Sequence, residues 1–444
     1  MNAPAKVIKV GILGLGNIGA GTLEVLRRNG DLIARRLGVP FEVVRAADLD
    51  PARAARLGLG PGVFTTDARA VVNDPEVQVV VELIGGLEPA RSLILAAMDN
   101  GKHVVTANKH LLSEHWEELV NKAEERRVSL GFEGSVAGGI PLIFAIRRGL
   151  VANRIRRVTG IINGTCNYIL SRMARERKPF SEILADAQAH GFAEANPALD
   201  VEGLDAAQKL SILVALCFDL TVKPDAIARA GITQVTPLDL AIAEELGYRL
   251  KLLSFAGSEG GAVEAWVHPA LVPVSHPLAA VDGVYNAIYL EDDNLGPSLY
   301  FGRGAGALPT GSAVVADLVS AARDILSGAV SRMPASGARV RGGERSRLRP
   351  PGEARGEFYL RVTALDRPGV LSAVTGVIGR HGVSIESVIQ RRPADGPAEA
   401  VPILIVTHEA SFAEMSAAVG ELDSLPVVRP GSFLARIIPE TASP

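Results

Sequence analysis

Residues 187–209 combine one lysine with four carboxylates, and their spacing could support acid–base chemistry. A helix beginning near Gly203 would place Asp205 and Lys209 four residues apart on one face. The continuation of this helix, LSILVALCF, is strongly apolar, so its polar end is expected to line a cavity. A lysine held among carboxylates in a cleft is a candidate general acid. The alternative is an exposed ion pair that contributes about 0.3–0.5 kcal/mol.

Two more acidic residues, Glu194 and Asp200, precede this helix in a segment bent by Asn196-Pro197. Several carboxylates beside one lysine suit a substrate that has a cationic amine and a group that must accept a proton. If this segment binds the substrate, other elements of the chain must bind the second reactant and hold it in place.

The pattern A-x3-G-F-x-E-x-N-P-x2-D-V-x-G-x-D-x3-K resembles the signature of the homoserine dehydrogenases. The resemblance implies that Lys209 is the proton donor, that Asp205 holds substrate and lysine, and that Glu194 binds the substrate amino group. It also implies reversible NAD(P)H-dependent reduction of L-aspartate 4-semialdehyde to L-homoserine, in the threonine and methionine branch of amino-acid biosynthesis. The substrate-binding residues expected from it are Glu194, Asp200, Asp205 and Thr165.

The first residues of the chain predict a nucleotide-binding domain. KVIKVGIL (6–13) is expected to form a buried strand, and Gly14-Leu15-Gly16-Asn17-Ile18-Gly19 separates it from a helical stretch. In this context G-x-G-x-x-G lets the backbone approach a pyrophosphate at the helix N-terminus, although a tight turn without a ligand has the same pattern.

The second strand, 41–48, ends at Asp48, which could accept hydrogen bonds from ribose hydroxyls and would favour NAD. Arg53 could instead meet the 2′-phosphate of NADP, so the choice between the two cofactors stays open. Residues 29–40 are expected to be an inserted loop, because they lengthen the usual spacing between the glycines and the acidic residue.

Strands expected at 77–86 and 102–109, with a helix at 89–100 between them, predict a Rossmann-type doubly wound parallel sheet. Lys109 follows Thr106 at a strand's carboxyl end, where ligands bind in such sheets, although it also suits an exposed helix start. The T-x-N-K motif of the family implies that Lys109 contacts cofactor and substrate as a second catalytic lysine. The expected cofactor-binding residues are Gly14, Gly16, Asn17, Ile18, Gly19, Asp48, Thr106, Lys109, Gly191, Gly304 and Gly306.

The segment SLGFEGSVAGGIPLI (129–143) is expected to run from a strand through exposed glycine-rich backbone into a helix. Its composition favours a glycine turn, but exposed carbonyl groups beside one carboxylate could also hold a hard cation. The family resemblance implies a structural sodium ion at Glu133 and the backbone oxygens of Val136, Gly138 and Ile140.

A second domain over 141–308 is expected to bind the substrate and to form the dimer contact. Asn163-Gly164-Thr165 would open a helix, either presenting N–H groups and a hydroxyl to a ligand or serving as an ordinary cap. Strands at 262–272 and 284–290 alternate as in an open, partly antiparallel sheet. The helix at about 309–327, from Thr310, is expected to complete the first domain (1–140), and in the family the preceding G-x-G-A-G-x-x-P-T segment lines the cofactor.

The last third of the chain predicts a linker and a small α+β domain. Residues 331–356 are rich in Arg, Pro and Gly and are expected to be a flexible tether. Residues 357–438 predict the ferredoxin-like order β-α-β-β-α-β, and D-R-P-G-V-L at its first turn resembles an ACT domain. The resemblance implies an amino-acid effector, with threonine as feedback inhibitor, whereas a dimerisation module without a ligand has the same order of elements.

The composition argues against several classes of protein. The net charge of −3 argues against nucleic-acid or membrane-surface binding, and no apolar run is long enough for a membrane helix. Only Cys166 and Cys217 are present, which fits a cytoplasmic protein without structural disulfides. A homodimer or homotetramer is expected. Two other hypotheses remain: another amino-acid dehydrogenase acting on a 2-oxo or imino acid, and a non-catalytic sensor of NAD(P) and an amino acid.

Overall fold

The computed structural model describes residues 7–328, 334, 336, 346–390 and 399–439. The chain divides into two compact units, each assembled from separate segments. Unit 1 comprises Met1–Ile155, Gln208–Pro224 and Glu291–Ser346, and unit 2 comprises Arg156–Ala207, Asp225–Leu290 and Arg347–Pro444. Within the described ranges, no helix has the length and apolar character needed to cross a membrane.

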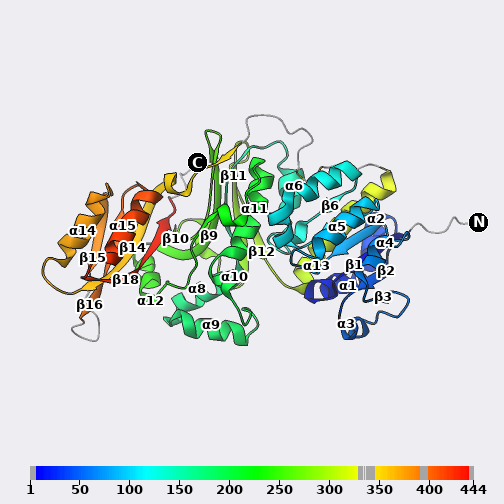
Figure 1. The fold of residues 1–444 in the computed structure, drawn as a ribbon, viewed down its shortest axis with the longest axis horizontal. Helices are drawn as coiled ribbons and strands as arrows, with labels where there is room; N and C mark the ends of the chain where they lie inside the picture. The colour runs from blue at the N-terminus through cyan, green and yellow to red at the C-terminus, as the bar shows by residue number, and fades with distance from the viewer. Residues whose placement is uncertain (1–6, 329–333, 335, 337–345, 391–398, 440–444) are drawn as a thin grey trace, which may run out of the picture. The chain divides into compact units, whose positions relative to one another are not determined.

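Unit 1 is built on a six-stranded parallel sheet in the order β3-β2-β1-β4-β5-β6 (Figure 1). The strands are β1 (Ile8–Leu13), β2 (Phe41–Ala47), β3 (Phe64–Thr65), β4 (Val79–Glu82), β5 (His103–Thr106) and β6 (Leu130–Gly131). Every residue of β4 is buried, as is typical of parallel strands covered on both faces. The covering helices include α1 (Asn17–Arg28), α3 (Pro51–Arg56), α4 (Ala68–Asn73), α5 (Ala90–Asp99), α6 (Lys109–Arg126) and α13 (Ala307–Ser327). The predicted doubly wound sheet is confirmed.

Helix α13, from far along the chain, packs on α1 as predicted, although it begins at Ala307 rather than Thr310. The two helices approach closely because glycines face each other. A Cβ atom added at Gly21 would lie 2.1 Å from the carbonyl oxygen of Ala307, and one added at Gly311 would lie 2.7 Å from the backbone of Gly21. The start of α13 is therefore held against the helix that follows the glycine-rich loop.

Gly21→Ala should destabilise the protein by about 1–3 kcal/mol, because the added methyl group would force α1 and α13 apart. Thermal unfolding of the variant against wild type measures this effect. Gly30→Ala is the matched control, since nothing lies within 4 Å of a Cβ added there. Equal unfolding temperatures for the two variants would contradict the close helix contact.

The inserted loop expected at 29–40 is in fact largely helix α2 (Gly30–Leu37). The helix ends at Gly38, whose φ of 91° gives it a left-handed C-terminal cap. None of its residues is fully buried, but Ile33 and Leu37 are partly buried and pack against the core of unit 1.

Unit 2 contains a mixed sheet in which β9 (Tyr248–Glu259) and β10 (Ala262–Pro273) form a long antiparallel pair. The strands β11 (Tyr285–Asp292) and β7 (Ile155–Ile161) continue the order as β11-β7-β9-β10. The expected alternation in β10 is wrong, because every residue except Glu264 is at least nine-tenths buried. The helices around this sheet are α8 (Gly164–Glu176), α9 (Phe180–Ala189), α10 (Ala198–Val201), α12 (Pro237–Glu245) and α11 (Leu204–Phe218), whose second part is assigned to unit 1.

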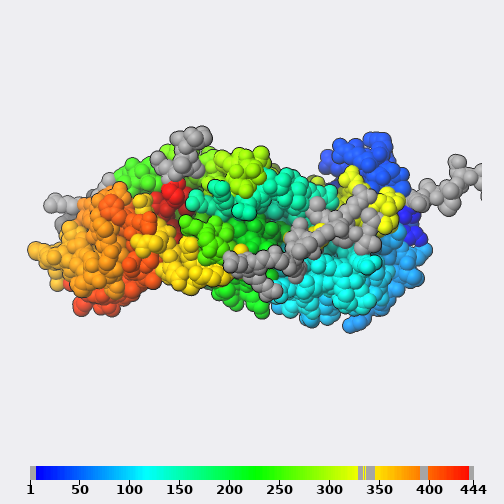
Figure 2. Space-filling view, turned by 90° about the horizontal axis from the view of Figure 1, so that it is seen from above, coloured from blue at the N-terminus to red at the C-terminus, as the bar shows by residue number. Residues whose placement is uncertain are grey.

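The C-terminal module has the predicted order β-α-β-β-α-β. Its elements are β14 (Arg355–Leu365), α14 (Val370–Arg380), β15 (Ile385–Gln390), β16 (Ala400–Thr407), α15 (Phe412–Ser424) and β18 (Val428–Ile437). However, it is not an independent body, because β18 pairs in parallel with β10, Ala270 opposite Arg436 and Leu271 opposite Ile437. In the space-filling view the orange and red residues of this module lie against green residues of the same unit (Figure 2).

Half of the predicted tether over 331–356 lies outside the described residues. Its last part is described, and there the prediction is wrong. Strand β13 (Arg347–Leu348) pairs with the start of β10, and the short helix η5 (Pro351–Glu353) leads directly into β14. Arg349 also approaches Glu264 at 3.6 Å, so this stretch is fastened to the sheet rather than loose.

A buried ionic cluster joins the C-terminal module to helix α12. Asp239, fully buried, accepts hydrogen bonds from the Tyr359 hydroxyl at 2.9 Å and from Arg361 Nε at 2.8 Å. Its other carboxylate oxygen accepts the backbone N–H and hydroxyl of Thr236, completing the cap of α12. Arg361 also donates to the carbonyl oxygen of Gln234 at 2.9 Å. The Asp239 carboxylate and the Arg361 guanidinium therefore both have hydrogen-bond partners within the protein.

Candidate active site

The glycine-rich loop of unit 1 leaves no room for a side chain at Gly14 or at Gly19. Gly14 has a φ of 95°, and a Cβ atom added there would lie 2.6 Å from the carbonyl oxygen of Leu83. One added at Gly19 would lie 2.2 Å from the carbonyl oxygen of Gly14. Helix α1 begins at Asn17, and its N-cap residue makes no side-chain hydrogen bond to the N–H groups of the first turn. The loop therefore fits the pyrophosphate of a dinucleotide, as the sequence predicts.

Asp48 follows β2 and lies beside the same loop. Its carboxylate accepts the N–H of Leu15 at 2.7 Å and that of Asp50 at 2.9 Å, and Arg53 Nη1 lies 3.3 Å away. Burial acts to raise the pKa of Asp48, but the two N–H groups and the guanidinium outweigh it and hold the pKa below its ordinary value. A Cβ atom added at Gly16 would be 3.9 Å from Arg53 Nη1. A nucleotide on this loop would thus meet both an acidic and a basic side chain.

The ends of β4 and β5 are joined by the carboxylate of Glu82, which the sequence analysis did not predict. Glu82, at the end of β4 and fully buried, accepts the Thr106 hydroxyl at 2.7 Å and the N–H groups of Ile84 and Gly85. The signal for it was an acidic residue directly after a run of valines at a strand end. Asn108 caps α6 by accepting the N–H of Leu111, so Lys109 is the first residue of that helix.

In unit 2, one amide brings two of the predicted carboxylates together. Asn163 Nδ2 donates to Asp200 Oδ1 at 2.7 Å and to Asp205 Oδ2 at 2.8 Å. Asp205 lies in the first turn of α11, and Lys209 follows one turn later, so the predicted helix start near Gly203 is confirmed. The bridging role of Asn163 was not foreseen, because it depends on a contact across 42 residues.

The other predicted substrate residues are Glu194, in the loop before α10, and Thr165, in the first turn of α8. Thr165 donates its hydroxyl to the carbonyl oxygen of Phe192 at 2.9 Å. Gln188 donates to the carbonyl oxygens of Glu194 and Ala195, at 3.0 and 3.3 Å. These bonds hold the backbone of Glu194 while its residue as a whole stays exposed. Gly191, with a φ of 72°, turns the chain into this loop.

The predicted cation loop is buried, in contrast to the exposed backbone expected from its glycines. Residues 135–138 are all buried, and both carboxylate oxygens of Glu133 accept N–H groups, from Ile143 at 2.9 Å and Phe144 at 2.7 Å. Burial, reinforced by the charge of Asp317, raises the pKa of Glu133 to about 8. The described residues include no group of three or more His, Cys, Asp and Glu side chains suited to a metal, so backbone oxygens would have to supply most ligands.

The segment before α13 lies against this loop within unit 1. The N–H of Gly139 donates to the carbonyl oxygen of Arg303 at 3.0 Å, and a Cβ atom added at Gly138 would be 2.3 Å from the carbonyl oxygen of Gly304. Gly306, with a φ of 118°, then starts α13, which packs on α1. Gly304 and Gly306 are therefore linked through α13 to the helix of the glycine-rich loop.

Comparisons with known proteins cover both units. Three family models match in succession: the homoserine dehydrogenase NAD-binding domain over residues 14–133, homoserine dehydrogenase over 141–319 and the ACT domain over 358–424. Curated homoserine dehydrogenases from Pseudomonas aeruginosa and Neisseria gonorrhoeae are 44% and 41% identical, spanning 96% and 95% of this chain and 98% and 97% of theirs.

The solved structures agree with these matches. A homoserine dehydrogenase from Thiobacillus denitrificans superimposes with a TM-score of 0.90 at 44% identity, covering 98% of both chains. One from S. aureus gives a TM-score of 0.75 at 32% identity over 98% of this chain and 100% of that one. The relatives and this chain therefore match over nearly their whole lengths. The chain belongs to the homoserine dehydrogenase family, oxidoreductases that act on a CH–OH group, with an NAD-binding domain, a catalytic domain and a C-terminal ACT domain.

Proposed function

We propose that this enzyme reduces L-aspartate 4-semialdehyde to L-homoserine with Lys209 as proton donor. The observation that carries the proposal is the pair of carboxylates, Asp200 and Asp205, held by one amide at the start of the helix that bears Lys209. A bound NAD(P)H would supply the hydride to the carbonyl carbon. As charge grows on the carbonyl oxygen, the Lys209 ammonium would donate its proton there.

The other site residues would orient the substrate. Asp205 would orient Lys209, and Glu194 would bind the α-ammonium group of the substrate. Asp200 and Thr165 would also bind the substrate. Lys109, the first residue of α6, would act at the carbonyl side and help to position the cofactor. The experiment is steady-state oxidation of NADPH and NADH with the semialdehyde as the second substrate.

We propose that Arg53 favours NADPH. Arg53→Ala should weaken NADPH binding about 10–100-fold, the loss of one charge-assisted hydrogen bond, and leave NADH binding nearly unchanged. Arg56→Ala is the matched control, because Arg56 lies on the same short helix with its side chain 69% exposed. Dissociation constants from nicotinamide fluorescence test this. Equal losses for both cofactors would assign the selectivity to another group.

We propose that a sodium ion binds at the Glu133 loop, with backbone oxygens of Val136, Gly138 and Ile140 as the further ligands. A buried carboxylate in a loop with positive φ at Ala137 and Gly138 supports it. The carbonyl oxygen of Ile140 already accepts the N–H of Leu142 at 2.7 Å, so it would have to serve both partners. Thermal unfolding in sodium chloride and in N-methylglucamine chloride at equal ionic strength tests the ion. Identical curves would argue against it.

We propose that the enzyme is a homodimer or a homotetramer. Strand β12 (Pro297–Arg303) of unit 1 alternates exposed and half-buried residues, and its Leu299 and Phe301 are 44% and 55% exposed. Exposed apolar side chains on a strand favour association with a second copy. Sedimentation equilibrium of the purified protein distinguishes the states, and a concentration-independent monomer would contradict the proposal.

We propose that threonine inhibits the enzyme through the ACT domain. The turn Asp366–Gly369 is exposed and leads into the N-terminus of α14, where backbone N–H groups could meet a carboxylate. The whole chain must be assayed, because removing residues 331–444 would also remove the strand that pairs with β10. Activity that is indifferent to millimolar threonine would leave the ACT domain with another effector or a purely structural role.

A further inference from the structure

We infer that Asn163 is a positioning residue for the reaction, because its amide holds the carboxyl groups of Asp200 and Asp205 together. This inference rests on the function proposed above. Asn163 is 4% exposed, and its two Nδ2–H bonds, 2.7 Å to Asp200 and 2.8 Å to Asp205, are each short enough to be charge-assisted.

The orientation of this amide follows from its neighbours. The Asn163 Oδ1 accepts the N–H of Cys166 at 2.8 Å, which is the N-terminal cap of α8. Only the opposite end of the amide can then face the carboxylates, and that end has two hydrogens for two acceptors. The same side chain thus performs two separable tasks: it caps a helix and it bridges two like charges that would otherwise repel.

Asp200 is tied to the same helix by a second contact. The Cys166 thiol donates to the carbonyl oxygen of Asp200 at 3.2 Å, so α10 is attached to the first turn of α8 through both its backbone and its side chain. Gly164 lies between Asn163 and Cys166 in the sequence. A Cβ atom added at Gly164 would lie 2.8 Å from the carbonyl oxygen of Val284. The N-terminus of α8 is therefore fixed on both sides.

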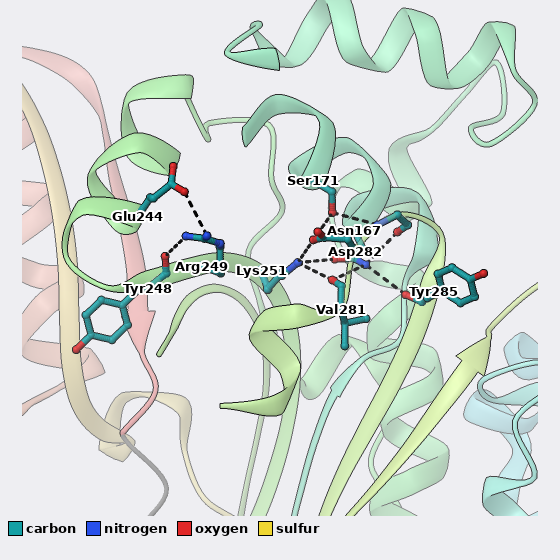
Figure 3. A network of polar contacts seen from close by, with 10 residues as sticks. Asn167, Ser171, Glu244, Tyr248, Arg249, Lys251, Val281, Asp282 and Tyr285 are labelled. Carbon is teal, nitrogen blue, oxygen red and sulfur yellow. Dashed lines mark hydrogen bonds and ion pairs between the residues drawn. The ribbon is translucent and has the colours of Figure 1, made fainter. Parts of the chain in front are cut away.

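One turn further along α8, Asn167 anchors the helix to the sheet. Asn167 is 2% exposed and donates to the carbonyl oxygens of Val281, Gly283 and Tyr285, at 3.1, 3.0 and 3.3 Å. Figure 3 shows Asn167 facing Lys251 on β9, whose ammonium donates to Val281 and Asp282 at 2.6 and 3.0 Å. Lys251 is 3% exposed, so this support is shielded from water. The amide of Asn163 is consequently held by a rigid helix, as a positioning group requires.

Three variants at one position separate the bridge from the cap. Aspartate and serine cap helices about as well as asparagine, whereas alanine does not. Aspartate has no donor and would place a third carboxylate between the other two; serine has one donor; alanine has none but adds no charge. A capping role alone predicts that N163D and N163S are silent and that N163A is the most damaging.

The bridging role predicts instead that N163D is more damaging than N163A. N163D should lower kcat/KM for the semialdehyde at least 100-fold, N163A less, and N163S least, while KM for NADPH stays within about twofold of wild type. N163D within threefold of wild type, or N163A below N163D, would overturn the inference. If N163D does not fold, N163S decides, since wild-type kinetics in N163S would also overturn it.

Turnover of the wild-type protein distinguishes a failure of this inference from a failure of the proposed function. If wild type shows no turnover of the semialdehyde, the proposed function fails. If wild type turns over normally and the three variants match it, only the positioning role of Asn163 fails.

Discussion

Lys209→Ala should lower turnover of aspartate 4-semialdehyde by about 10²–10⁴-fold, the usual contribution of a positioned general acid. The reduction needs a proton on the oxygen as hydride arrives, and without the Lys209 ammonium that proton would have to come from water or from a less well placed group. Cofactor affinity should change little, because the dinucleotide loop at Gly14–Gly19 belongs to β1 and α1. Stopped-flow turnover and NADPH titration of the same preparation measure both quantities.

Lys223→Ala is the matched control for this variant. Lys223 lies a few residues beyond the same helix, its side chain is 71% exposed, and its ammonium approaches Glu114 only at 3.6 Å. Its removal should leave turnover within about twofold of wild type. Comparable activity in both variants would assign proton donation to another group, with Lys109 the first to examine.

Arg361→Met should destabilise the protein by about 3–5 kcal/mol, because it leaves the fully buried Asp239 carboxylate without its charged partner. Tyr359 and Thr236 would still donate hydrogen bonds, but neither carries a positive charge. Since this pair joins the ACT domain to helix α12, the loss should appear in unfolding of unit 2 as a whole. Urea unfolding followed by tryptophan fluorescence suits the measurement, because Trp266 lies in β10.

Arg355→Met gives the matched comparison on the same strand. Arg355 pairs with Glu409 at 2.7 Å, but the two side chains are 54% and 64% exposed. Such surface pairs contribute at most about 1 kcal/mol. If both variants unfolded at the same urea concentration, the buried pair would not be holding the ACT domain to the rest of unit 2.

Local patterns predicted the parts of the fold that local physics determines. The glycine-rich loop, the buried valine strands and the start of α11 follow from spacing within about 20 residues, and the structure has each of them. The order of elements in the ACT domain was likewise predictable, because every strand and helix there carries its own periodicity.

Long-range contacts were not predictable in this way. The pairing of β10 with β18 joins residues far apart in the chain, and nothing in either strand marks its partner. The Asp239–Arg361 pair spans 122 residues, and the contacts of Asn163 with Asp200 and Asp205 span 37 and 42. A flexible tether was therefore inferred where residues 347–356 are in fact attached to the sheet. The sequence predicts for Asn163 either ligand contacts or a helix cap, and the cap is the part of its role that depends on local residues alone.

The most direct test of the account is the rate of NADPH and NADH oxidation by the purified wild-type enzyme with L-aspartate 4-semialdehyde, measured with and without threonine. We expect rapid oxidation that depends on the semialdehyde, faster with NADPH, and slowed by threonine. Folded protein that oxidises neither cofactor with this substrate would contradict the assignment of Lys209, Asp205 and Glu194 to this reaction.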